Sequence, residues 1–194
     1  MRTHQSKLLA AALVAVCGGW STAQAQTPSP QQWKEGVLTA PSSLVTEHSL
    51  LREDLLRAAA DPGGVGDAAK AVEHILTPHL QHQEQVVLLP LGMIRGLVDG
   101  EPMAEPARVL EIVDQIDREL PQLLQEHRAI LDATRRFSDA ARREGKAQYL
   151  RLADRIRTHI LLEDQVLYPS ALLVGRYLKS SQDPKRPRTA SRHP

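Results

Sequence analysis

His159-Ile160-Leu161-Leu162-Glu163 lies in the last of four segments with helical periodicity. Residues four apart on a helix point in nearly the same direction, so this pair can present an imidazole and a carboxylate to one point. Single histidines on the other three segments, His48, His79 and His127, have comparable positions. One histidine from each of four helices is how a metal site is assembled in the core of a four-helix bundle.

The four segments show the apolar stripes of amphipathic helices. We predict helices at 42–60, at 66–98, from about 106 to 144, and at 146–178. Pro78 and Pro90 should kink the second helix or split it near position 90, and Pro121 should kink the third, because proline lacks the backbone N–H that a helix interior needs. None of the segments alternates as a β-strand does. Short connections favour antiparallel neighbours, so the predicted fold is all-α, an antiparallel up-down-up-down four-helix bundle.

The first 25 residues have the pattern of a secretory signal peptide. Arg2 and Lys7 precede or flank the start of an apolar run at 8–16, and Ala23-Gln24-Ala25 is a small-residue cleavage site. The apolar run is too short for a permanent anchor, so we expect no stable membrane insertion after cleavage. The expected location is periplasmic or secreted. Cys17, the single cysteine, would be removed, and the mature chain would have no disulfide.

The rest of the chain divides into an extended leader at 26–41, the bundle at 42–178 and a disordered basic tail at 179–194. The chain has 24 Lys and Arg against 23 Asp and Glu. Basic residues are concentrated in the tail and the bundle is mildly acidic, so we predict no nucleic-acid surface. The apolar stripes are sufficient for one closed bundle, which favours a monomer.

All four histidines lie on the apolar stripes of their helices. Burying four imidazoles without a common purpose would cost desolvation at every one of them. A shared metal site is the more economical explanation. Imidazole with carboxylate suits iron, zinc, manganese or copper, and the absence of thiolates from the mature chain argues against an iron–sulfur cluster or a cysteine zinc site.

The same residues resemble the hemerythrin-like, or HHE cation-binding, domain family over roughly 42–178. That family has a histidine on the first helix, His-x-x-x-Glu on the second, a histidine on the third, and His-x-x-x-Glu on the fourth, often followed by proline. The matching stretches are Glu47-His48-Ser49-Leu50-Leu51-Arg52, Pro78-His79-Leu80-Gln81-His82-Gln83-Glu84, Gln125-Glu126-His127-Arg128-Ala129-Ile130, and His159-Ile160-Leu161-Leu162-Glu163 with Pro169.

The second helix departs from the family pattern, because Gln83 stands where the carboxylate is expected. Glu84 follows, but it lies about 140° round the helix from His79, against about 40° for Gln83. Gln83 could bind through its carbonyl oxygen, a kink at Pro78 or Pro90 could bring Glu84 inward, His82 could substitute, or the ligand could be missing. A neutral amide also leaves the positive charge of two metal ions less compensated. This favours an asymmetric dinuclear site, a single-metal site or a site that has lost its metal.

The resemblance implies a non-haem di-iron centre, with zinc or manganese as alternative metals. The candidate metal ligands are His48, His79, Gln83, Glu84, His127, His159 and Glu163. The expected function is to bind or sense a small diatomic ligand such as dioxygen or nitric oxide, or to buffer iron. The alternatives are a di-iron oxidoreductase acting on peroxide or nitric oxide, and a metal-free helical interaction protein whose site decayed at Gln83. The sequence does not decide whether the protein is an enzyme.

Overall fold

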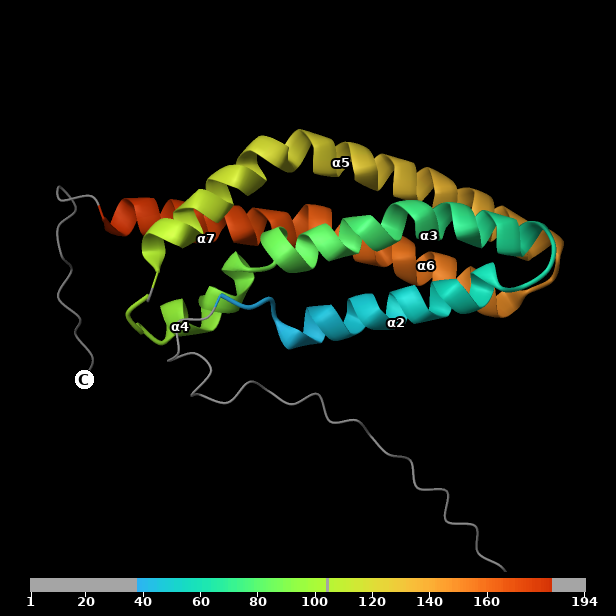
Figure 1. Cartoon of the computed structure of the whole chain (residues 1–194), viewed down its shortest axis with the longest axis horizontal. Coiled ribbons are helices and arrows are strands. Elements are labelled where there is room, and N and C mark those ends of the chain that lie inside the picture. The colour runs from blue at the N-terminus through green and yellow to red at the C-terminus, as the bar shows by residue number, and fades with distance from the viewer. Residues whose placement is uncertain (1–37, 104, 183–194) are drawn as a thin grey trace, which may run out of the picture.

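Long helices lie side by side in an elongated bundle (Figure 1). The computed structural model describes residues 38–103 and 105–182, and every regular element within them is helical. The four rods of the bundle are α2 (Ser42–Ala59), α3 (Gly64–His82), α5 (Pro106–Arg143), and α6 (Ala147–Leu162) continued by α7 (Tyr168–Ser181). Rod α2 packs against α3 and α6, α3 packs against α5, and α5 packs against α6 and α7. The predicted all-α antiparallel bundle is confirmed.

The second rod breaks near Pro90, as predicted. A π-helical segment, Gln83–Val87, follows α3, a 3-10 turn covers Pro90–Met93, and α4 (Ile94–Val98) completes this part of the chain. Because the proline nitrogen carries no hydrogen, it cannot continue the helical ladder. The chain then turns through Gly100, whose φ of 71° lies in the left-handed region that glycine adopts without strain.

The fourth rod is continuous but not uniformly α-helical. A second π-helical segment, Glu163–Leu167, joins α6 to α7. The third rod, α5, stays α-helical through Pro121, and α3 stays α-helical through Pro78. The periodicity therefore predicts where the rods run but not where their winding changes.

Apolar clusters fill the bundle, and two of them flank the buried histidines on either side. The cluster near the α2–α3 and α5–α6 turns includes Leu55, Leu76, Phe137 and Ile156. The cluster toward the other end includes Leu88, Ile116, Leu123 and Tyr168. On each rod the histidine lies where one cluster gives way to the other, so the polar site is enclosed by apolar side chains at both ends.

Several of the predicted segments lie partly or wholly outside the residues that the structure describes. The predicted signal peptide, the leader up to residue 37 and the tail from residue 183 lie outside the described ranges. Helix α7 continues to Ser181, beyond the boundary that we predicted at residue 178. Among the described helices, none combines the length and the apolar character needed to cross a membrane.

Candidate metal centre

Four histidines, one from each rod, meet in the middle of the bundle. The side chains of His48, His79, His127 and His159 are buried, with residue exposures between 0 and 3%. Together with Glu163 they form two groups whose potential ligand atoms lie within 4.8 Å of one another. One group is His48, His159 and Glu163, and the other is His79, His127 and Glu163.

Glu163 belongs to both groups because its two oxygens face different ways. Its Oε1 lies 2.6 Å from Nε2 of His159, and its Oε2 lies 2.9 Å from Nε2 of His127 and 3.3 Å from Nε2 of His79. A fully buried carboxylate in this position can bridge two cations.

The local helical winding determines where the side chain four residues after a site histidine points. Gln83 and Glu163, each four residues after a histidine, are the first residues of the two π-helical segments. In the first of these, the amide of Leu88 donates to the carbonyl of Gln83 at 2.9 Å, five residues back. Single π-helical turns widen a helix and occur frequently at functional sites. No signal in the residue pattern predicted either of them.

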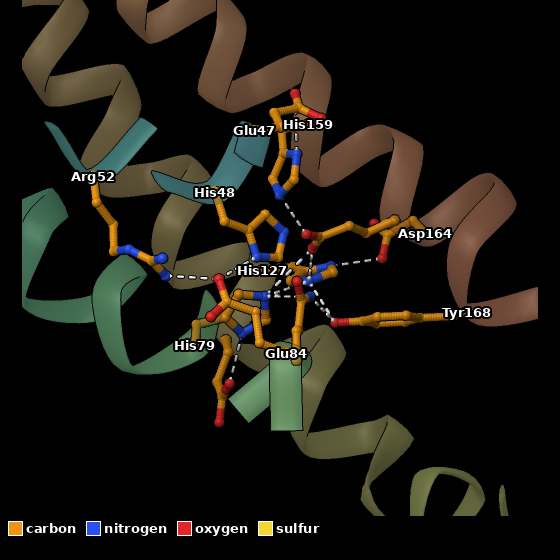
Figure 2. A network of polar contacts seen from close by, with 12 residues as sticks. Glu47, His48, Arg52, His79, Glu84, His127, His159, Asp164 and Tyr168 are labelled. Atoms are coloured by element: carbon orange, nitrogen blue, oxygen red, sulfur yellow. Dashed lines mark hydrogen bonds and ion pairs between the residues drawn. The ribbon is translucent and has the colours of Figure 1, made fainter. Parts of the chain in front are cut away.

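A carboxylate on a neighbouring rod contacts the outer nitrogen, Nδ1, of every site histidine. Figure 2 labels Glu84, Asp164 and Glu47 among these carboxylates. Each of these carboxylates is adjacent in sequence to a site residue of its own rod. The pairs are His48 with Glu84 (3.0 Å), His79 with Glu126 (2.9 Å), His127 with Asp164 (2.7 Å) and His159 with Glu47 (3.4 Å). We call Glu47, Glu84, Glu126 and Asp164 the outer carboxylates.

The outer carboxylates link the rods in a closed cycle. Glu47 of α2 contacts the histidine of α6, and Asp164 of the fourth rod contacts the histidine of α5. Glu126 of α5 contacts the histidine of α3, and Glu84 of the second rod contacts the histidine of α2. At His48, His79 and His127 the carboxylate accepts a hydrogen bond from Nδ1, which keeps the ring proton there and turns the lone pair of Nε2 toward the interior. Nδ1 of His159 lies 3.4 Å from Glu47 without a hydrogen bond. The sequence analysis missed this role for Glu47, Glu126 and Asp164, although each directly neighbours a predicted ligand.

The interior of the site therefore requires positive charge. The Nε2 atoms of His79 and His127 lie 3.1 Å apart, and both face the acceptor-only carboxylate of Glu163. The buried atoms without a hydrogen bond include Nε2 of His48, Nε2 of His159 and Oε1 of Glu163. The contact between His159 and Glu163 is short, but its angles are not those of a hydrogen bond. Protons or metal cations must separate these lone pairs. The donor set, imidazole and carboxylate, fits a metal ion in each group.

The electrostatics of the metal-free site favour a charged Glu163. Burial would raise the pKa of this carboxyl, but contacts from His127, His159 and His79 outweigh burial and hold its pKa well below the usual value. Burial lowers the pKa of His127 and of His159, yet Glu163 together with Asp164 at His127, and with Glu47 at His159, outweighs burial, so both pKa values are raised. Burial and the charge of His159 lower the pKa of His48. A cation entering the site would displace protons from the first two histidines.

Tyr168 is a site residue that the sequence analysis did not identify. Its hydroxyl oxygen lies 2.9 Å from Nε2 of His127 and 2.8 Å from Nε2 of Gln83. In an α-helix, residues five apart lie about 140° from each other, so Tyr168 should face away from Glu163. The π-helical segment between them places both side chains in the interior. Burial, followed by the charge of Glu163, raises the pKa of Tyr168.

Gln83 is fully buried beside the second group. Its Nε2 lies 2.9 Å from Nε2 of His79, while its Oε1 has no hydrogen-bond partner. Rotating the amide by half a turn exchanges these atoms and would place the carbonyl oxygen near His79. The structure thus brings Gln83 into the interior, where it can offer a neutral oxygen.

Glu84 and His82 lie outside both groups. Oε1 of Glu84 contacts the outer nitrogen of His48 and accepts a hydrogen bond from Nη1 of Arg52 at 2.9 Å. His82 contacts Glu119 at 2.9 Å on the partly exposed side of α3. Both residues line or flank the surface side of the rods, so among the predicted ligands the second rod brings His79 and Gln83 to the interior.

A surface pocket of about 430 Å³ reaches one edge of the site. It lies between α3 and α5, and its lining includes His79, His82, Glu119, Leu123 and Glu126. The pocket brings solvent to the outer side of the His79–Glu126 pair. The apolar clusters described above cover the site along the bundle axis.

Comparison with known proteins gives one match. The family model described as Hemerythrin HHE cation binding domain matches residues 39–171, which include both groups, Gln83, the outer carboxylates and Tyr168. No curated protein and no solved structure gives a significant match to this chain.

Proposed function

Because the chain belongs to the hemerythrin HHE cation-binding domain family, we propose that it holds two non-haem iron ions and binds or senses a small diatomic ligand such as dioxygen or nitric oxide. The family implies a bound metal, typically iron. One ion would be held by His48, His159 and Glu163, and the other by His79, His127 and Glu163. The observation that carries the proposal is that three buried imidazole nitrogens lie 2.6 to 3.3 Å from the two oxygens of the buried Glu163, with a nitrogen of His48 within 4.8 Å.

The side chains present suit reversible binding of a small molecule. Iron held by these residues would supply an open coordination position at which a diatomic ligand could bind. The outer carboxylates orient the imidazoles and increase their basicity. The two apolar clusters limit the access of water, which affects both the redox potential and the choice of ligand.

We further propose that the protein acts outside the cytoplasm. The support is the sequence of residues 1–25, in which a basic start, an apolar run and a small-residue cleavage site follow one another. An exported protein of this kind would scavenge, sense or buffer its ligand in the periplasm or outside the cell.

Metal analysis tests the proposal. The mature protein, purified without a His tag and without added metal, is expected to contain close to two irons per chain. Glu163→Gln should lose most of this iron, because it removes the charge shared by both groups. Asp154→Asn is the matched control, since Asp154 lies on the same rod with its side chain 75% exposed. The iron-loaded protein should then show absorption changes on adding dioxygen or nitric oxide.

Other metal contents would contradict parts of the proposal. One ion per chain, or zinc in place of iron, would indicate a mononuclear or structural site. No metal after anaerobic loading with ferrous iron would favour the metal-free interaction protein. Iron that gives no spectral change with either gas would overturn the ligand-binding role and leave iron storage.

A further inference from the structure

We propose that the hydroxyl oxygen of Tyr168 is a metal ligand, binding as a phenolate to the ion held by His79 and His127. The inference rests on the proposed function to the extent that it requires a metal in this group. On coordination, the O–H bond breaks as the oxygen–metal bond forms, and the proton leaves to solvent.

The distances around the second group are those of atoms that share one metal. Ligand atoms about 2.1 Å from an ion and at right angles to each other lie about 3 Å apart. Nε2 of His127 is 3.1 Å from Nε2 of His79, 2.9 Å from Oε2 of Glu163 and 2.9 Å from the hydroxyl of Tyr168. The phenol oxygen thus has the same spacing as the two predicted ligands.

The aromatic ring of Tyr168 is held in place by packing. The residue is 2% exposed, and its ring stacks on the imidazole of His127 with centroids 5.2 Å apart and planes 25° apart. Tyr168 begins α7 directly after the π-helical segment. A buried ring fixed between two helices positions its oxygen with little conformational cost on binding a metal.

With the Gln83 amide oriented as in the structure, its nitrogen toward Tyr168, metal binding would leave the hydroxyl proton without an acceptor. In the metal-free site, the hydroxyl can donate to Nε2 of His127 and accept from Nε2 of Gln83. These are the hydrogen-bond contacts of this hydroxyl within the described residues. A cation that takes the lone pair of His127 removes the acceptor, and the phenol oxygen then faces the cation. Losing the proton resolves the conflict, because a buried hydroxyl without a partner is costly.

The charge of the interior also favours a phenolate. Glu163 is the one carboxylate that faces inward among the described residues, and Gln83 contributes none. Two divalent ions would then carry four positive charges against one inward negative charge. A phenolate on the group beside Gln83 adds the second negative charge where the amide leaves it missing.

Ferric loading gives a direct test. The protein is loaded anaerobically with ferrous iron and oxidised with ferricyanide, which takes one electron from each iron. A ferric phenolate gives a visible charge-transfer band whose resonance Raman spectrum contains tyrosine ring modes, whereas histidine and carboxylate ligands give none. We expect the band in the wild type. The chain has three tyrosines; the Tyr149 hydroxyl contacts Asp61 and Tyr177 is 47% exposed, so the band can be assigned to Tyr168.

The variants separate a ligand from a packing residue. Tyr168→Phe should abolish the band and lower iron affinity by about 10-fold or more, by analogy with the loss of other groups around a metal. Tyr177→Phe, on the same helix, should keep both the band and the affinity. If Tyr168→Phe loses helicity in far-UV circular dichroism, ring-deuterated tyrosine in the wild type provides the independent measurement, because the Raman modes must then shift.

Two results would overturn the inference. A wild type with its full iron content but without tyrosine modes would exclude Tyr168 as a ligand and leave the proposed function intact. A wild type that takes up no iron would overturn the inference and the proposed function together, and the metal content distinguishes this case from the first.

Discussion

Residues adjacent to the candidate ligands control the direction in which the histidines point. Nδ1 of His79 contacts Glu126, a neighbour of His127 in sequence. Burial would raise the pKa of Glu126, but the contacts with His79, Gln122 and His82 together outweigh burial and lower it, so the carboxyl is charged near neutral pH. A charged acceptor at Nδ1 both fixes the tautomer and strengthens Nε2 as a ligand.

Glu126→Gln should therefore weaken metal binding without touching a ligand. We expect iron affinity to fall about 10-fold, within the range typical for partners of metal-binding histidines. The control is Glu119→Gln on the same helix, because Glu119 pairs with His82 at the same 2.9 Å distance and has the same 32% side-chain exposure as Glu126. Competition with a chelator measures both affinities. Equal affinities in the two variants would show that the Glu126 contact has no effect on the site.

Gln83→Glu should have opposite effects on the metal-free and the iron-loaded protein. Without metal, a second buried carboxylate near Glu163 should lower the melting temperature, because desolvation and like charge both disfavour it. With metal, the same carboxylate should raise iron affinity and therefore the gain in melting temperature on loading. Gln81→Glu, at an exposed position on the same helix, is the control. A variant destabilised in both states would contradict this prediction.

The site could be predicted from the sequence only where α-helical spacing holds. His159 and Glu163 are four apart and converge as expected. Tyr168 could not be found in this way, since five residues of α-helix would turn it away from Glu163. The histidine partners require knowing which rods are neighbours, and that is a property of the folded bundle.

At the level of helices, the apolar stripes locate the rods well. The predicted starts at residues 42 and 106 match α2 and α5, and the predicted break at Pro90 is present. The π-helical segments were not predicted, because a template with 3.6 residues per turn has no place for an extra residue. Both segments begin at the residue four positions after a site histidine, so the local winding of the helix and the geometry of the site depend on each other.

Close packing of α7 on α5 depends on Gly175. A Cβ atom added there would lie 2.3 Å from Cγ1 of Val113, closer than side chains can approach. Gly175→Ala should destabilise the fold by about 1–3 kcal/mol through overpacking, against a helix-propensity gain of up to about 1 kcal/mol. Gly96→Ala in α4 is the control, because its added Cβ meets only the Glu101 side chain at 3.5 Å. Urea unfolding measures both variants; equal stabilities would show that α5 and α7 can separate at no cost.

In the whole molecule, the site lies at the junction of two apolar clusters. The end of the bundle at the α2–α3 and α5–α6 turns is closed by contacts that involve no residue of the site. At the α2–α3 and α5–α6 turns, Oδ1 of Asp61 accepts a hydrogen bond from Nζ of Lys146 at 2.7 Å, and Oδ2 accepts one from the hydroxyl of Tyr149 at 2.8 Å. Beside them, the backbone amide of Val65 donates to Oε1 of Glu144 at 3.0 Å. These contacts join two loops that are distant in sequence, so composition alone gives no sign of them.

The Asp61 contacts should make stability depend on pH in a defined direction. Hydrogen bonds from Lys146, and then from Tyr149, lower the pKa of Asp61 in the folded state. A folded-state pKa below the unfolded-state pKa of about 3.9 stabilises the fold at every pH above the unfolded-state pKa. This stabilisation is lost as the pH falls through the folded-state pKa. Wild type should therefore be more stable than Asp61→Asn at pH 6, and the difference should shrink below about pH 4.

The comparison needs metal-free protein, because metal binding is itself linked to protonation of the site histidines. Unfolding in urea, with a chelator present, gives the free energy of unfolding of each variant at each pH. Asp132→Asn serves as the control, since the Asp132 side chain is 64% exposed and pairs with Arg135 only at 3.5 Å. Surface pairs of this kind contribute little, so its difference from wild type should be small at every pH. If Asp61→Asn shows the same flat profile, the two loops are not held together by the charge of Asp61, and the apolar cluster beneath them closes this end of the bundle.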